Sequence, residues 1–239
     1  MPKRSRMPIT TITLDAAGTL IRTTHPVGDT YLQIAKAHGA ELDAKALAHG
    51  FGETYAAMPP MAFTDAGGAK LDALERDWWR ALVRQVTERA GGVKRFDDFF
   101  TSLYSYYAKG SAWTLYPEVL PVLTGLAARG YRLAVISNFD SRLPGVLSQL
   151  GVLKRFESIV FSTEAGAAKP DPGIFEEALK RLHITAEEAL HAGDNSDADF
   201  AGARAMGMHA LLLRRSGGAT PPHEAVDLQG IWPYLEQLA

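Results

Sequence analysis

Four groups of polar residues in this sequence have the types and the order needed for chemistry on an anionic substrate. The first is Asp15, which opens the segment DAAGTL at 15–20 directly after a short apolar run. The second is Ser137-Asn138, whose small side chains suit phosphate oxygens, and the third is Lys169, a positive charge placed before a helix start. The fourth is GDNSDAD at 193–199, an acidic segment that offers the hard oxygen ligands preferred by Mg²⁺.

Taken singly, these residues also have ordinary structural interpretations as turn, cap or surface residues. The elements around them change that interpretation. Short apolar or β-branched runs predict buried strands at 9–14, 132–137, 158–162, 189–193 and 209–213. Apolar residues at helical spacing predict helices at 119–129, 142–150, 173–182 and 199–206. Strands that alternate with helices indicate a parallel sheet, so the four polar groups should meet at its carboxyl edge, where such sheets bind ligands.

The stretch from 22 to 111 has a different character, because it contains no clear strand. Helical patterns occur at 31–38, 44–49, 69–90 and 97–109, and the aromatic residues at helical spacing favour a separate apolar core over a cofactor site. We therefore expect a doubly wound, three-layer α/β/α Rossmann-like core with a parallel sheet, formed by residues 1–21 and 112–239. A helical domain at 22–111 is inserted after the first strand.

The composition excludes several classes of protein. The 239 residues include no cysteine, which excludes a disulfide framework, a thiolate zinc site and a cysteine nucleophile. A net charge of −2 gives no reason to expect binding to nucleic acid or to an anionic membrane. No stretch approaches the roughly 20 apolar residues of a membrane span, and the basic start MPKRSRM resembles a tail more than a secretory signal. We expect a cytoplasmic protein whose oligomeric state the sequence does not indicate.

Together, and in this order, the polar groups resemble the motifs of the haloacid dehalogenase superfamily. The matching segments are DAAGTL at 15–20, ISN at 136–138, KPDPGIF at 169–175 and GDNSDADFAGA at 193–203. The resemblance covers nearly the whole chain, because the helical insert falls where the family has its C1 cap. HPVG at 25–28, followed by Tyr31, and SNFDSR at 137–142 look more specifically like the rhythmically-expressed-gene-2-like branch.

The resemblance implies a nucleophile and a metal site. Asp15 would accept a phosphoryl group as an aspartyl-phosphate. Mg²⁺ would offset the repulsion between this carboxylate and the phosphate, held by Asp15, the backbone carbonyl of Ala17 and Asp194. Asp199 would complete the metal site by orienting a metal-bound water.

The resemblance also implies a phosphate-binding set, made of Thr19, Ser137, Asn138 and Lys169. Lys169 would balance the charge that develops on the transferring phosphoryl group, where most of the catalytic effect lies. Asp15, Ser137 and Lys169 are thus the expected catalytic residues. The expected activity is Mg²⁺-dependent hydrolysis of a small phosphorylated metabolite.

One departure from the family pattern concerns proton transfer. Phosphatases of the family usually carry a second aspartate two residues after the nucleophile, as general acid and then base, and this chain has Ala17 there. The backbone carbonyl that would bind the metal is still present. The general acid–base contribution to the reaction rate, about 10²–10⁴-fold, is lost unless another group supplies it. Asp140, His25 and water are the candidates. Hydrolysis of substrates with poor leaving groups should be weak.

Three other functions are alternatives to phosphate monoester hydrolysis. Metal-free dehalogenation is disfavoured by the presence of Asp194 and by the absence of arginine from the first cap helix. Phosphonate hydrolysis would need a lysine in an apolar pocket of the cap, which offers Lys36, Lys45, Lys70, Lys94 and Lys109. A non-catalytic relative that binds phosphate or a protein partner would be favoured by exposed aromatic residues near Trp78-Trp79 or Phe99-Phe100.

Overall fold

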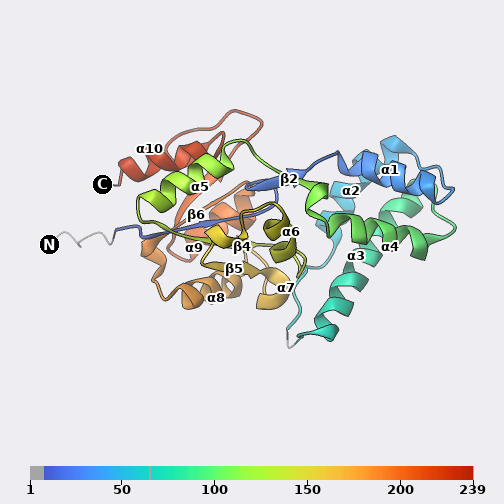
Figure 1. Ribbon diagram of the computed structural model, residues 1–239, viewed down its shortest axis with the longest axis horizontal. Helices are drawn as coiled ribbons and strands as arrows, with labels where there is room; N and C mark the ends of the chain where they lie inside the picture. Colours follow the sequence, from blue (N-terminus) through green and yellow to red (C-terminus); the bar gives the residue numbers. More distant parts are fainter. Residues whose placement is uncertain (1–7, 65, 239) are drawn as a thin grey trace.

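The computed structural model describes residues 8–64 and 66–238. The basic start at 1–7, which belongs to the range expected for the core domain, lies outside the described residues. The chain folds into a larger part with a central sheet and a smaller helical part beside it (Figure 1). No helix among the described residues is long and apolar enough to cross a membrane.

A six-stranded parallel sheet forms the centre of the larger part. Its strands lie in the order β5-β4-β1-β6-β7-β8, so the first strand of the chain is central and is flanked by β4 and β6. The strands are β1 (Thr11–Leu14), β4 (Arg132–Ser137), β5 (Ser158–Phe161), β6 (Ala189–Gly193), β7 (His209–Leu213) and β8 (Glu224–Ala225). This confirms the parallel α/β sheet predicted from the sequence.

Helices cover both faces of this sheet, which gives three layers. The helices of this part are α5 (Val119–Ala128), α6 (Leu143–Gln149), α7 (Ser162–Ala165), α8 (Pro172–Leu182), α9 (Gly202–Ala205) and α10 (Ile231–Glu236). Apolar residues of α5, α6 and α10 pack in one cluster, and those of α8 and α9 pack in another on the opposite face. Strand β4 supplies Val135 to the first cluster and Ile136 to the second, as the period of two in a strand requires.

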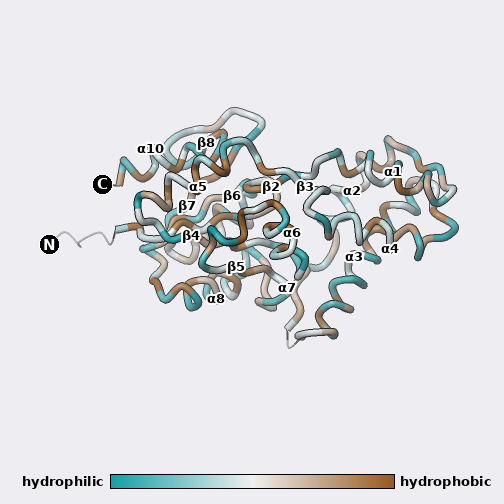
Figure 2. The backbone as a smooth tube through the Cα atoms, in the orientation of Figure 1, coloured by the Kyte–Doolittle hydropathy of each residue, from teal (hydrophilic) through white to brown (hydrophobic). Residues whose placement is uncertain are grey.

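The smaller part is a helical bundle with a core of its own. It consists of α1 (Val27–Ala37), α2 (Ala44–Ala57), α3 (Ala69–Arg89) and α4 (Phe96–Tyr107). Leu82, Phe99 and Phe100 are among its fully buried side chains. Figure 2 shows the alternation of hydrophobic and hydrophilic residues along these helices that lets each bury one face. We call this bundle the cap.

Two short strands join the cap to the core. β2 (Ile21–Thr23) and β3 (Trp113–Leu115) pair antiparallel, with Arg22 opposite Thr114. The expectation that 22–111 contains no strand is therefore wrong at its first residues. The pairing joins segments about ninety residues apart in the chain, and a three-residue run carries too little periodicity to reveal it.

Three helices also differ from the sequence prediction. α1 begins at Val27, before the predicted start at residue 31. α2 continues past His49 to Ala57, so Gly50 and Gly52 lie inside the helix and do not end it. The helix expected at 199–206 begins earlier, with a π-helical turn, η4 (Ser196–Ala201), that leads into α9. Such turns are frequent at functional sites, and this one carries Asp199.

Candidate active site

The sheet topology brings the predicted polar groups together. Asp15 follows β1, Ser137 ends β4, and Asp194 follows β6. Because β4 and β6 are the two parallel neighbours of β1, all three residues emerge at the same edge. The backbone N–H of Asp15 donates to the carbonyl of Ala192 at 3.0 Å, which fixes the start of the loop after β1 against β6.

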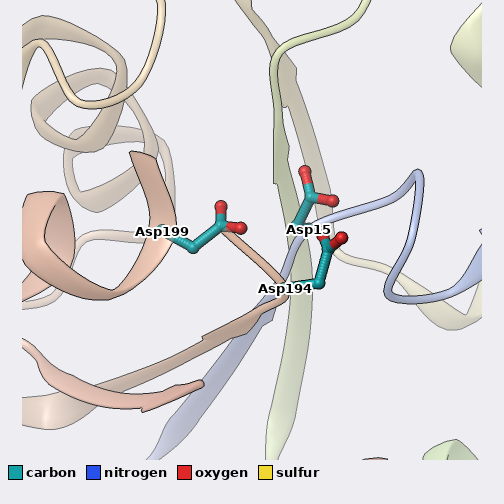
Figure 3. A group of neighbouring side chains, drawn as sticks. All are labelled: Asp15, Asp194 and Asp199. Atoms are coloured by element: carbon teal, nitrogen blue, oxygen red, sulfur yellow. The ribbon is translucent and has the colours of Figure 1, made fainter. Parts of the chain in front are cut away.

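Three carboxylates converge at this edge. One oxygen each of Asp15, Asp194 and Asp199 lies within 4.8 Å of the others. Figure 3 shows the carboxyl group of Asp199 pointing from its helical turn toward the other two. Glycines make this approach possible: a Cβ at Gly18 would lie 2.3 Å from Oδ2 of Asp194, and one at Gly193 would lie 2.2 Å from Cγ of Asp199.

Lys169 lies between two of these carboxylates. Its ammonium group donates to Oδ1 of Asp15 at 2.7 Å and to Oδ1 of Asp199 at 2.5 Å, and also to the backbone carbonyl of Ile136. The Ser137 hydroxyl donates to the same oxygen of Asp15 at 2.9 Å. Oδ1 of Asp15 is thus held by two donors, and no described residue donates to its Oδ2.

Burial and charge set the protonation states of these groups. Burial raises the pKa of Asp15 to about 6, against the lowering effect of the Lys169 charge. Burial also opposes ionisation of Asp199, but Lys169 and a hydrogen bond from His191 hold the pKa of that carboxyl well below its usual range. Burial raises the pKa of Asp194, and the nearby charge of Asp199 raises it further. Lys169 keeps its proton, because Asp15 and Asp199 outweigh burial and raise its pKa.

Asp199 is bound on both of its oxygens. Besides Lys169, it has His191 Nε2 at 3.3 Å from Oδ1, and the backbone N–H of Asn195 donates to Oδ2 at 2.9 Å. His191 is fully buried, and burial lowers its pKa, so the ring is neutral. Its Nδ1 lies 3.0 Å from the Thr13 hydroxyl, which fits a proton on Nε2 donated to Asp199. His191 lies in the buried strand predicted at 189–193, and the structure adds a role for it in orienting Asp199.

The other two predicted phosphate-binding residues lie in the same site. The Thr19 hydroxyl donates to Oδ1 of Asp194 at 3.5 Å. The Asn138 side chain bonds the backbone of Lys169 on both sides, donating to its carbonyl at 2.9 Å and accepting from its N–H at 2.7 Å. In this conformation Asn138 therefore positions the loop that carries Lys169.

The candidates for a replacement proton donor are placed differently from one another. Ala17 is exposed, so its side chain leaves room at that position. His25 is also exposed, on the segment that leads into the cap. Asp140 is fully buried and ion-paired with Arg142, and the Trp79 indole donates to its Oδ2 at 2.6 Å.

Two sets of contacts around the site could not be predicted from the sequence. Arg215, after β7, donates to the backbone carbonyls of Gly18 and Thr19 and pairs with Glu118 at 2.9 Å, so it holds the loop after Asp15. Glu75 of the cap is fully buried and accepts from the N–H of Ser141 at 3.0 Å. It also accepts from the hydroxyls of Ser141 and Thr163 in the core. Charged residues on a helix or after a strand are usually solvated, and only the tertiary structure shows these contacts.

A cavity of about 400 Å³ lies between the cap and the core. Ala17, Gly18 and Asn138 line its end at the carboxylate cluster, and all four cap helices contribute to its walls. Nine of its 19 lining residues are aromatic. The site therefore combines a charged centre at the sheet edge with an apolar chamber directly beside it.

Comparison with known proteins agrees with this arrangement. A family model for haloacid dehalogenase-like hydrolases matches residues 9–207. The chain belongs to this hydrolase family. The human haloacid dehalogenase-like hydrolase domain-containing protein 3 is 36% identical over 236 residues, covering 98% of this chain and 93% of that protein. The rhythmically expressed gene 2 protein of Drosophila melanogaster is 27% identical over 238 residues, covering 94% and 91%, which is consistent with the predicted branch.

Two further matches concern an enzyme and a solved structure. The glyceraldehyde 3-phosphate phosphatase of Methanopyrus kandleri is 41% identical over 164 residues, covering 62% of this chain and 70% of that protein. The structure of the HAD-hydrolase YfnB from Bacillus subtilis aligns with a TM-score of 0.72 at 16% identity, covering 96% of this chain and all of that one. At this identity the likeness shows the fold, and it confirms the predicted three-layer architecture.

Proposed function

We propose that this hydrolase is a Mg²⁺-dependent phosphatase that transfers a phosphoryl group from a small phosphate monoester to Asp15 and then to water. The observation that carries the proposal is the charge balance of the site. Three carboxylates face one ammonium group, that of Lys169, within a few ångströms. When all are ionised, two negative charges remain, which matches a divalent cation.

The donor set fits Mg²⁺ by its chemistry. Asp15 and Asp194 offer carboxylate oxygens, and the backbone carbonyl of Ala17 is a further oxygen on the same loop. Asp199, with both oxygens already bound, is better suited to orient a water than to bind the metal directly. When bound, Mg²⁺ would offset the repulsion between the Asp15 carboxylate and the phosphate.

The remaining groups have separate tasks in the proposed reaction. Ser137 and Lys169 hold one oxygen of Asp15, which leaves Oδ2 for attack on phosphorus. Lys169 also supplies fixed positive charge where the transferring group develops negative charge. The phosphatase relative from Methanopyrus kandleri supports this class of reaction.

The alternative functions receive less support. All five candidate lysines of the cap are exposed and none is among the described residues that line the cavity, which disfavours Schiff-base chemistry on a phosphonate. Trp78, Phe99 and Phe100 are buried, and Trp79 faces the cavity, so these aromatic residues form no exposed docking patch. The retained Asp194 disfavours metal-free dehalogenation.

The proposal is tested by measuring phosphate release from a panel of phosphate monoesters with and without Mg²⁺. Asp15→Asn is the matched control, since it keeps the acceptor oxygen for Ser137 and Lys169 and removes the nucleophile. We expect turnover that requires Mg²⁺ and vanishes in the variant. Unchanged turnover in Asp15→Asn, or no turnover by a folded protein that binds Mg²⁺, would refute the proposal.

A further inference from the structure

We infer that the site hydrolyses phosphate monoesters whose leaving group is an uncharged aromatic ring, bound in the cavity between cap and core. The inference rests on the proposed phosphatase function and adds a substrate class to it. Two independent observations point to this class. One is the chemistry of the cavity wall, and the other is the missing proton donor at Ala17.

The inner end of the cavity adjoins the predicted catalytic residues. Ala17 and Gly18, which follow Asp15 in the chain, and Asn138 form its inner end. Tyr55 of α2 lies in its wall, and the pKa of Tyr55 is raised by burial and then by the negative charges of Asp15 and Asp140. Because the lining residues Ala17 and Gly18 directly follow Asp15, the group that leaves phosphorus when Asp15 attacks would enter this chamber.

The wall is suited to a flat apolar group. Aromatic residues come from both sides of the junction, for example Tyr31 and Tyr104 from the cap and Phe139 from the core. Ring faces and edges favour stacked or edge-on contact with another ring. A chamber of about 400 Å³ is within the usual range for small-molecule sites.

The described charged residues of the wall are two arginines, Arg22 and Arg142, and the Arg22 guanidinium lies 5.4 Å from the centre of the Tyr116 ring. No described lining residue is acidic. The Arg142 guanidinium is paired with Asp140 and lies 4.1 Å from the centre of the Tyr104 ring, so its charge is already engaged. A sugar or polyol would lose hydrogen bonds to water on entering and would regain some of them from phenol hydroxyls such as that of Tyr107, whereas a ring would gain apolar contact with most of the wall.

The absence of a proton donor at position 17 favours the same class of substrate, aryl phosphates, for a different reason. As the bond from the Asp15 oxygen to phosphorus forms, the bond from phosphorus to the leaving oxygen breaks and its electron pair goes to that oxygen. An alkoxide needs a proton at this moment, and Ala17 cannot give one. A phenolate is stable enough to leave unprotonated and takes its proton from water afterwards. The effect of the cavity is therefore measured between substrates with leaving groups of similar reactivity, and the effect of the leaving group between substrates that both carry the ring.

The test uses four substrates that vary ring and leaving group independently: phenyl phosphate, benzyl phosphate, acetyl phosphate and glyceraldehyde 3-phosphate. Ring burial predicts a KM about tenfold or more lower for phenyl phosphate than for acetyl phosphate, and for benzyl phosphate than for glyceraldehyde 3-phosphate. The absent donor predicts a higher kcat for phenyl and acetyl phosphate. Equal KM values with and without the ring, or a lower KM for glyceraldehyde 3-phosphate, would overturn the inference while leaving the phosphatase function intact.

A variant tests the cavity itself. Val83 of α3 is buried and lines the cavity, so Val83→Phe should raise KM for the two ring substrates and leave acetyl phosphate unchanged. Val86→Phe is the matched control, because Val86 is equally buried in the same helix and does not line the cavity. An equal rise in KM for acetyl phosphate and the ring substrates in Val83→Phe would overturn the inference.

A binding measurement needs neither turnover nor a variant that folds. Calorimetric titration of the Mg²⁺-loaded protein with phenylphosphonate and methylphosphonate compares the ring with a methyl group on the same anion. We expect the ring compound to bind about tenfold or more tightly. Equal affinities would refute the ring site even if the protein proved to be inactive.

Discussion

The indole N–H of Trp79 in the cap donates a 2.6 Å hydrogen bond to Oδ2 of Asp140 in the core. The same carboxylate is ion-paired with Arg142, whose guanidinium donates to both of its oxygens. Asp140 is therefore a structural link between cap and core, and its oxygens are occupied by donors. This disfavours Asp140 as the replacement for the missing general acid.

We predict that Asp140→Asn destabilises the protein without changing the alkaline limb of the pH–rate profile, where a proton donor loses its proton. Breaking a buried ion pair by removing one partner costs about 3–5 kcal/mol, because Arg142 would remain buried without its charge partner. Thermal unfolding and a pH series of kcat measure the two effects. Asp97→Asn is the control, since its pairing with Arg80 is exposed and should contribute less than about 1 kcal/mol. A profile that loses its alkaline limb would make Asp140 the proton donor.

Ala17→Asp should restore the missing acid and base. Ala17 is exposed at the inner end of the cavity, so a carboxyl group fits there without displacing core residues. We expect alkyl phosphates to gain up to about 10²-fold in kcat and activated aryl phosphates to gain much less. Ala17→Asn, of nearly the same size but without an acidic proton, should gain nothing. A folded Asp variant that binds Mg²⁺ and shows no gain would mean that another residue already transfers the proton.

Lys169→Met should lower turnover by about 10²–10³-fold, because the fixed charge near the phosphoryl group is lost. It should also destabilise the metal-free protein, since Asp15 and Asp199 would face each other without a cation between them. Phosphate release and thermal unfolding with and without Mg²⁺ provide the measurements. Lys154→Met, at an exposed position, is the control. A variant that keeps both turnover and stability would remove Lys169 from the mechanism.

The raised pKa of Asp15 makes a prediction about stability in the absence of metal. Its carboxyl group is harder to ionise in the folded protein, with a pKa of about 6, than in the unfolded chain, near 3.8. Ionisation therefore destabilises the fold, by up to roughly 3 kcal/mol above pH 6, and this penalty disappears as the pH falls toward 3.8. Asp15→Asn should raise the Tm of the metal-free protein at pH 8 and raise it less at pH 5. If Asp15→Asn had a lower Tm at pH 8 than the unchanged protein, burial of the ionised Asp15 carboxylate would not be destabilising.

The grouping of polar side chains at the carboxyl edge of the sheet could be predicted, because it depends on local sequence patterns. Each polar group follows an apolar run, and parallel strands place their carboxyl ends together, so Asp15, Ser137 and Asp194 meet as expected. The helix that follows Lys169, predicted at 173–182, begins at Pro172, and Asp171 caps it by accepting from the N–H of Gly173.

The long-range contacts around the site could not be predicted in this way. Glu75, Trp79 and Arg215 reach partners far away in the sequence, and nothing in their neighbourhoods distinguishes them from solvated or core residues. The prediction made from the aromatic residues of the cap was only partly correct. Their helical spacing correctly indicated a core, but the same helices also turn Tyr104 and Tyr107 toward the cavity.

The central claim is that Asp15 becomes phosphorylated, and the missing base makes this directly observable. Without an aspartate at position 17, attack of water on the aspartyl-phosphate is slowed, so the intermediate should accumulate with a good leaving group. The measurement is acid quenching during turnover of an activated aryl phosphate, followed by mass spectrometry of the peptide that contains Asp15. We predict a phosphoryl group on Asp15 that is absent in Asp15→Asn, together with a burst of released phenol. Steady turnover with no phosphoryl group on Asp15, or with one on another residue, would contradict the account.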